Sequence, residues 1–220
     1  MQTFATSAPI TAVVAIPAGR IQFTAAEQDS TSVEIRPANP DKGRDVKLAG
    51  QVTAAYSDGV LQITSPAGDR IFGSSGAVEV AVRLPAGSRV EATAASAQFT
   101  TAGPLGEVTF DSSQGTITVD EAATARLTTV DGDITVGRVG GDAEIRTVKG
   151  DIVVTEAAGG TVVLATQTGA ITVGAASGVS AALDAGTTLG RVHNALRNAD
   201  GTPGLTIQAT ALGDITARSL

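Results

Sequence analysis

Three stretches of the chain repeat one pattern: TVDGDITV (Thr129–Val136), TVKGDIVV (Thr147–Val154) and TQTGAITV (Thr166–Val173). In each stretch a glycine is followed by one small or polar residue and then by an alternating, β-branched segment. The step from glycine to an apolar residue recurs six times, at spacings of 17, 18, 19, 21 and 23 residues. Its apolar residues are Ile117, Ile134, Ile152, Ile171, Val192 and Ile215. Such self-similarity is typical of stacked repeats and not of an enzyme's site.

From residue 88 onward, each repeat is expected to hold two short strands joined by a glycine corner, with glycine chosen for its tolerance of positive φ. An apolar anchor in the first strand precedes one in the second, by 7 residues in five of the seven repeats. Side chains alternate along a strand, so a constant offset keeps the anchors on one side. The anchor pairs are Ala92/Phe99, Phe110/Ile117, Leu127/Ile134, Ile145/Ile152, Leu164/Ile171, Leu183/Val192 and Ile207/Ile215.

These repeats predict an all-β fold: a single-stranded parallel β-helix, or β-solenoid, of about seven coils over residues 88–220. Residues 1–87 also alternate apolar and polar positions but lack the period, so we expect an irregular, β-rich N-terminal section that packs on or caps the solenoid. No amphipathic helix of useful length is predicted there. Its candidate strands are Ile10–Ile16, Arg20–Thr24, Ser32–Arg36, Val46–Tyr56, Val60–Thr64 and Ala77–Leu84.

Composition excludes several classes of function. The net charge of −7 argues against nucleic acid as a partner, and aromatic residues, at 3%, are too few for base stacking. There is no cysteine, so a disulfide framework and a thiolate metal site are both excluded. No Lys or Arg precedes Arg20, and no apolar run reaches the ~18 residues that span a bilayer. We therefore expect a cytoplasmic protein with no signal peptide, transmembrane segment or membrane insertion.

The tandem Thr-x-x-Gly-Asp-Ile-x-Val units, the bend over residues 84–90 and the closing segment over residues 213–217 resemble the putative-adhesin family of bacterial β-strand-repeat proteins. The resemblance covers nearly the whole chain and is strongest to the actinobacterial members of the family. The chain is also distantly similar to bactofilins. It implies a β-helix of unknown function with a β-rich N-terminal section and no established catalytic residues.

Candidate catalytic groups are few. The single histidine, His193, is expected to point outward if Val192 points inward, which suits an exposed residue better than a general base. The segment Gly73–Gly76 lacks the glycine spacing of a nucleophile elbow and reads as a loop. We predict no catalytic, cofactor-binding or metal-binding residues and no cofactor, so the chain is not expected to be an enzyme.

Two surface patterns remain open. Asp133 and Asp151 occupy equivalent corners of adjacent coils, about 5 Å apart, so they could hold a cation, although aspartate beside glycine is also ordinary turn chemistry. The basic residues 126, 138, 146 and 191 are interleaved with acidic ones and predict a mixed-charge, solvated face. The most regular surface feature is a set of threonines expected to point outward: 116, 118, 128, 129, 135, 147, 155, 166, 168 and 172.

The favoured interpretation is a non-catalytic, adhesin-like structural and interaction module that presents flat polar faces to an unknown protein or glycan. The alternative is a self-assembling cytoplasmic scaffold, a homo-oligomer that stacks through the solenoid ends. It is motivated by the final coil, Leu205–Ala217, which no predicted helix covers.

Overall fold

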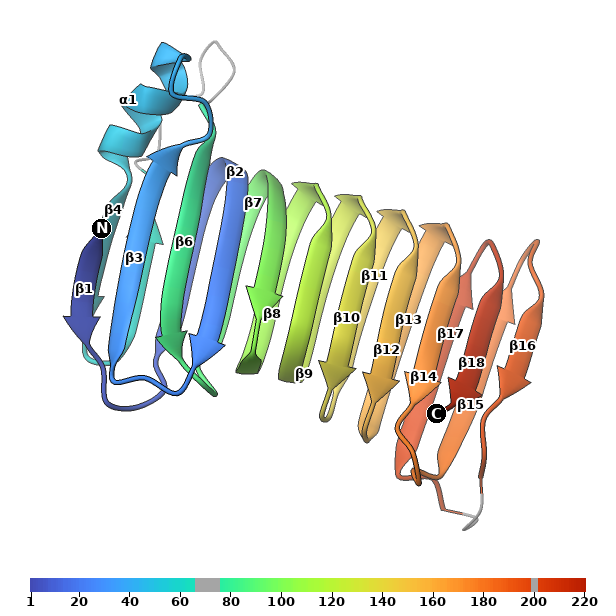
Figure 1. Ribbon diagram of the computed structural model, residues 1–220. Coiled ribbons are helices and arrows are strands. Elements are labelled where there is room, and N and C mark those ends of the chain that lie inside the picture. The colour runs from blue at the N-terminus through green and yellow to red at the C-terminus, as the bar shows by residue number, and fades with distance from the viewer. Residues whose placement is uncertain (66–75, 199–201) are drawn as a thin grey trace.

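The computed structural model describes residues 1–65, 76–198 and 202–220, which are mostly β (Figure 1). One helix is present in this part of the chain, α1 (Gly43–Gln51). The strands in chain order are β1 (Gln2–Ala5), β2 (Thr11–Ala26), β3 (Ser30–Pro37), β4 (Thr53–Ser57), β5 (Val60–Thr64), β6 (Val78–Pro85), β7 (Arg89–Ala102), β8 (Pro104–Gln114), β9 (Ile117–Asp131), β10 (Ile134–Val139), β11 (Ala143–Lys149), β12 (Ile152–Ala157), β13 (Gly160–Thr168), β14 (Ile171–Ala175), β15 (Ala181–Thr187), β16 (Val192–Ala195), β17 (Leu205–Ala211) and β18 (Ile215–Ser219).

The strands form one long, largely parallel sheet that is arranged as two facing layers (Figure 1). The front ladder runs β1-β3-β6-β2-β7-β9-β10-β12-β14-β18-β16, using the C-terminal halves of β2 and β7 and the N-terminal half of β9. The back ladder runs β4-β5-β2-β7-β8-β9-β11-β13-β17-β15, using the remaining halves of those strands. Each repeat therefore contributes one strand to each ladder.

The predicted register is confirmed through the central repeats. In the front ladder Ile117 pairs with Ile134, Ile134 with Ile152, and Ile152 with Ile171. These four isoleucines are at most 1% exposed. In the back ladder the predicted anchors Ala92, Phe110, Leu127, Ile145 and Leu164 likewise stand side by side and are buried.

The core lies between the two ladders and is built from inward aliphatic columns with a few aromatic rings at the N-terminal side. Phe99 and Phe110 stack with ring centroids 4.4 Å apart, and Phe23 lies 6.0 Å from Phe99. Burying a Leu or Ile side chain contributes roughly 1.5–3 kcal/mol, so most of a repeat's stability comes from stacking on its neighbours.

The order of the last two repeats differs from the prediction. Strands β17 and β18 pair with β13 and β14, and β15 and β16 are added outside them. Leu164 therefore pairs with Ala209, whereas Leu183 pairs with Ile207. The final coil, expected to end the stack, is covered on both sides, and the end is formed by β15 and β16. The inserted repeat is the more apolar one: Leu205 and Ile207 are fully buried.

The N-terminal section extends both ladders rather than forming a separate layer. Strand β2 pairs in parallel with β7 along residues 11–24. The strand direction changes near this end, because β3 is antiparallel to both β6 and β1, and β4 is antiparallel to β5. The Phe4 and Tyr56 rings, 5.6 Å apart, join β1 and β4 across the interior. The division at residues 87/88 stays a prediction, with the sheet continuous across it.

A helix replaces part of one predicted strand. The expected strand Val46–Tyr56 is wrong up to residue 51, since α1 occupies that segment and only β4 remains extended. Leu48 and Ala49 pack on the core, and the buried Asp45 carboxylate accepts the Ala77 N–H at 3.0 Å. Positions 45, 48, 49 and 52 have helical spacing, so the inward side of this segment follows a 3.6-residue period.

The corner glycines form a column in which backbone lies directly against backbone. A Cβ on Gly150 would lie 2.2 Å from the Gly132 carbonyl oxygen, and one on Gly190 would lie 2.2 Å from that of Gly213. The expectation that positive φ explains every corner glycine holds for Gly150 (φ 144°) but not for Gly190 or Gly213, which are not in that region. The shared reason for glycine is this close approach of adjacent repeats.

Replacement of Gly150 by alanine is expected to lower the free energy of unfolding by more than about 2 kcal/mol, since the methyl group overlaps a backbone oxygen that cannot rotate away. The melting temperature should fall by about 4–8 °C. Gly186→Ala is the matched control, because nothing lies within 4 Å of its Cβ position. Equal melting temperatures for the two variants would contradict the glycine column.

Candidate functional site

Aspartates line the corner where the back ladder passes into the front ladder. Asp133 Oδ1 accepts the Asp151 N–H at 2.8 Å, and Asp151 Oδ1 accepts the Ala170 N–H at 2.8 Å. Asp214 accepts the Arg191 N–H at the same distance. Each carboxylate thus holds the backbone of the next repeat, as turn chemistry predicts.

The sequence predicts that Asp133 and Asp151 could hold a cation, but this arrangement brings no third acidic or histidine ligand to them among the described residues. Among the residues that the structure describes, no three His, Asp or Glu side chains come together in a group able to hold a metal ion. The two carboxylates already accept backbone hydrogen bonds, and the geometry therefore assigns them a role in joining repeats.

Three threonines predicted to point outward are in fact buried. Thr129, Thr147 and Thr166 are at most 4% exposed and lie three residues before the corner glycines. Thr147 donates to the Gly132 carbonyl at 3.2 Å, and Thr166 donates to the Gly150 carbonyl at 2.9 Å. Each of them lies two positions beyond an inward anchor, with one residue between, so alternation along the strand places them inside.

The remaining candidates for catalysis do not assemble. His193 is exposed on β16, beside Thr216 of β18. Val192 lies in the inward column but is 44% exposed, because β18 is the one described strand that pairs with β16. The Gly73-Ser74-Ser75 part of the loop expected at Gly73–Gly76 lies outside the described residues.

A row of β-branched side chains crosses the front ladder on its outer side. The pairing places these residues side by side, one from each successive strand, and all are exposed or half-buried. Thr155 and Thr168, also expected outside, are exposed but lie beyond the row. The row, called the threonine row below, comprises Thr100, Thr118, Thr135, Val153, Thr172 and Thr216.

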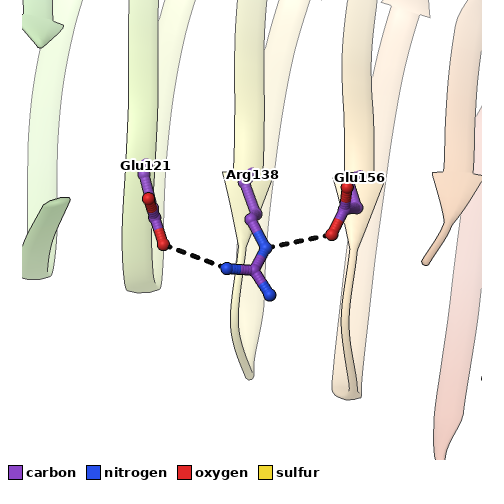
Figure 2. Close-up of polar contacts among 3 residues, drawn as sticks. All are labelled: Glu121, Arg138 and Glu156. Carbon is purple, nitrogen blue, oxygen red and sulfur yellow. Dashed lines mark hydrogen bonds and ion pairs between the residues drawn. The ribbon is translucent and has the colours of Figure 1, made fainter. Parts of the chain in front are cut away.

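Charged residues on the same ladder form ion pairs across strands around Arg138 (Figure 2). Arg138 of β10 contacts Glu121 of β9 at 3.2 Å and Glu156 of β12 at 3.0 Å. Sequence reasoning treated Arg138 as part of a mixed-charge face but missed these partners. Their spacings of 17 and 18 residues match the anchor spacings, and this was the signal available in the sequence.

The back ladder carries a second ionic cluster beside a shallow depression of about 420 Å³. Glu144 is contacted by Arg126 at 2.9 Å and by Arg146 at 2.8 Å. The hydrogen bond from Arg146, together with the positive charges of Arg126 and Arg146, lowers the pKa of Glu144 below its ordinary value of 4.5. Among the residues that line the depression, Arg126 and Arg146 are both ion-paired with Glu144.

The sequence profile of the Toastrack DUF4097 family matches residues 13–218, and the chain belongs to this family. The family resemblance that the repeat motifs predicted is thereby confirmed, and the family is not defined by a catalytic activity. The comparison with curated proteins found no match. Within the described residues, no helix is long and apolar enough to cross a membrane.

Solved bacterial structures resemble the chain at low sequence identity. A "putative lipid binding protein" from Parabacteroides distasonis is 15% identical with a TM-score of 0.50, covering 98% of this chain and 95% of that one. A "putative adhesin" from Bacteroides fragilis is 12% identical with a TM-score of 0.45 and the same coverage. A "putative cell adhesion protein" from Clostridium sporogenes is 14% identical with a TM-score of 0.34, covering 100% and 98%. At such identities the first of these supports the fold alone.

Asp151→Ala is expected to lower the free energy of unfolding by about 1 kcal/mol, because the Ala170 N–H loses its acceptor. Asp151→Asn keeps an acceptor oxygen and should stay near the parent. Chemical denaturation of both variants checks this. If calcium raised the parent's melting temperature and not that of Asp151→Asn, a cation site would replace the joining role.

Glu144→Gln is expected to lower stability at neutral pH by less than about 1 kcal/mol, since solvent screens a partly exposed pair. The lowered pKa means that the folded protein binds the proton more weakly than the unfolded chain does. The carboxylate's contribution is therefore present above pH 4.5 and is lost as the pH falls through the folded-state value. Denaturation of parent and variant at neutral pH and in acid should show the difference shrinking in acid; a difference that stays constant would contradict it.

Proposed function

We propose that this chain is a non-catalytic interaction module, a β-solenoid whose two ladders are the long sides and whose front ladder presents a flat polar face to a protein or glycan partner. The observation that carries the proposal is the threonine row. If the partner is displayed on a surface to which this protein attaches, the role is adhesin-like. Two of the solved proteins above have adhesion in their names.

The threonine row supports recognition because its geometry is regular and its chemistry is mixed. Neighbouring strands of a sheet lie about 4.8 Å apart, so the row repeats a methyl group at that interval and, at every position except Val153, a hydroxyl group. Each hydroxyl can donate one hydrogen bond and accept others, whereas each methyl adds apolar contact. A flat row of this kind fits an extended ligand with its own repeat, such as a glycan chain or a β-strand.

The charges beside the row favour a preformed face. Arg138 is already engaged by Glu121 and Glu156, and such exposed pairs contribute little stability but limit where the side chains point. A partner that binds beside them meets an ordered surface and loses less conformational entropy on association.

Two arguments support a non-catalytic role. The single histidine, His193, stands on an end strand, away from the ionic cluster around Glu144 on the back ladder. The corner carboxylates of Asp133 and Asp151 are engaged by backbone N–H groups. Neither arrangement offers the nucleophile, base and orienting group that hydrolysis needs.

A double variant, Thr135→Lys with Thr172→Lys, is expected to weaken partner binding at least about tenfold, because long charged side chains interrupt the row. Thr128→Lys with Ala165→Lys adds the same charge to the outer side of the back ladder and serves as the control. Binding is measured on a glycan array and by crosslinking to surface and cytosolic protein fractions of the native host, kept separate. Equal binding by both double variants, or no binding of the parent to any probe, would overturn the proposal.

A further inference from the structure

The C-terminal end of the sheet is open. Within the described part of the chain, β15 pairs only with β17 and β16 only with β18, so each has one edge without a partner strand. On that edge of β15 the Ala181 N–H donates to the Arg197 carbonyl at 3.0 Å, and no described strand pairs with the edge beyond Ala181. Exposed edges are usually blunted by lysine, proline or a covering element. Strand β15, with the sequence AALDAGT, contains a single charged residue, Asp184, and no proline.

The inward columns are also unfinished at this end. Val192 continues the column of Ile117, Ile134, Ile152, Ile171 and Ile215, each at most 1% exposed, yet Val192 is 44% exposed. Leu189, in the adjacent corner, is 79% exposed. Covering these side chains takes one more pair of strands.

The charges of the end repeat are complementary between its two strands. Asp184 lies on the outer side of β15, whereas Arg191 and Arg197 flank β16. None of the ion pairs among the described residues includes any of these three groups. In the central repeats, by contrast, arginines and glutamates pair across strands.

The N-terminal end is finished differently. Phe4 and Tyr56 meet across the interior between β1 and β4, and α1 packs beside β3 and β6. The aromatic contact covers the interior at this end, whereas Val192 at the other end stays 44% exposed. The two ends of the molecule are therefore not complementary, which disfavours an open head-to-tail polymer.

We propose that two copies of this chain pair through their β15–β16 ends, with β15 of each copy antiparallel to β16 of the other. A two-fold axis parallel to the strands produces both pairings at once and closes the assembly as a dimer. Asp184 of one copy then faces the strand flanked by Arg191 and Arg197 of the other, whereas pairing β15 with itself would oppose the two Asp184 carboxylates. This dimer does not depend on the proposed binding face.

Sedimentation equilibrium over concentrations up to about 100 µM tests the association, since a dimer with a Kd in the micromolar range is largely assembled at that concentration. The parent is expected to approach twice the monomer mass and no more. Asp184→Lys should weaken the dimer at least about tenfold, and the charge exchange Asp184→Arg with Arg197→Asp should restore most of the loss. Asp111→Lys makes the same charge change on an exposed position of β8 and should leave the dimer intact.

Disulfide trapping tests the pairing. Because the chain has no cysteine, Gly186→Cys in β15 and His193→Cys in β16 are each the only thiol in their variant. A mixture of the two variants should crosslink under mild oxidation, and each variant alone should not. A parent that stays monomeric, a mass that grows beyond the dimer, an Asp184→Lys variant that behaves like Asp111→Lys, or crosslinking of either variant alone would each overturn the proposal.

Discussion

The close approach of one repeat's backbone to the next at the glycine corners is the constraint on which the rest of the structure depends. With Gly150 against the Gly132 carbonyl, no side chain fits between repeats at the turn, and the strands on either side enter the ladders in one register. Because side chains alternate, that register places Ile134 and Ile152 in one inward column. A shift by a single residue would turn the whole column toward solvent.

The polar groups near the corner reinforce this register rather than serve chemistry. Threonine hydroxyls inside the turn donate to glycine carbonyls, and aspartate carboxylates outside it accept backbone N–H groups from the next repeat. Hydrogen bonds of this kind satisfy backbone groups that a tight turn would leave unpaired. The carboxylates and hydroxyls near the corner are thereby engaged in hydrogen bonds that join the repeats.

The order of the repeats follows from burial. The repeat of β17 and β18 places Leu205, Ile207 and Ile215 inside, whereas that of β15 and β16 offers Leu183, Val192 and several alanines. The interior position covers a repeat on two sides and the end position on one, so the more apolar repeat gains more from the interior. The same preference leaves an incomplete edge at the end of the molecule, with consequences for self-association.

The sequence by itself determined the period, the two strands of each repeat and the inward anchors from Phe99 to Ile171, because local alternation and glycine spacing encode them directly. It also contained the signals for α1, in the helical spacing of positions 45, 48, 49 and 52, and for the buried Thr147, two residues beyond an inward anchor. Only the tertiary structure decided that Ile171 pairs with Ile215 and not with Val192. Ile215 and Val192 both fit the same local pattern as partners of Ile171. The entropy cost of closing the chain is nearly the same for the shorter and the longer connection, so the order of repeats that buries more apolar area is the one that forms.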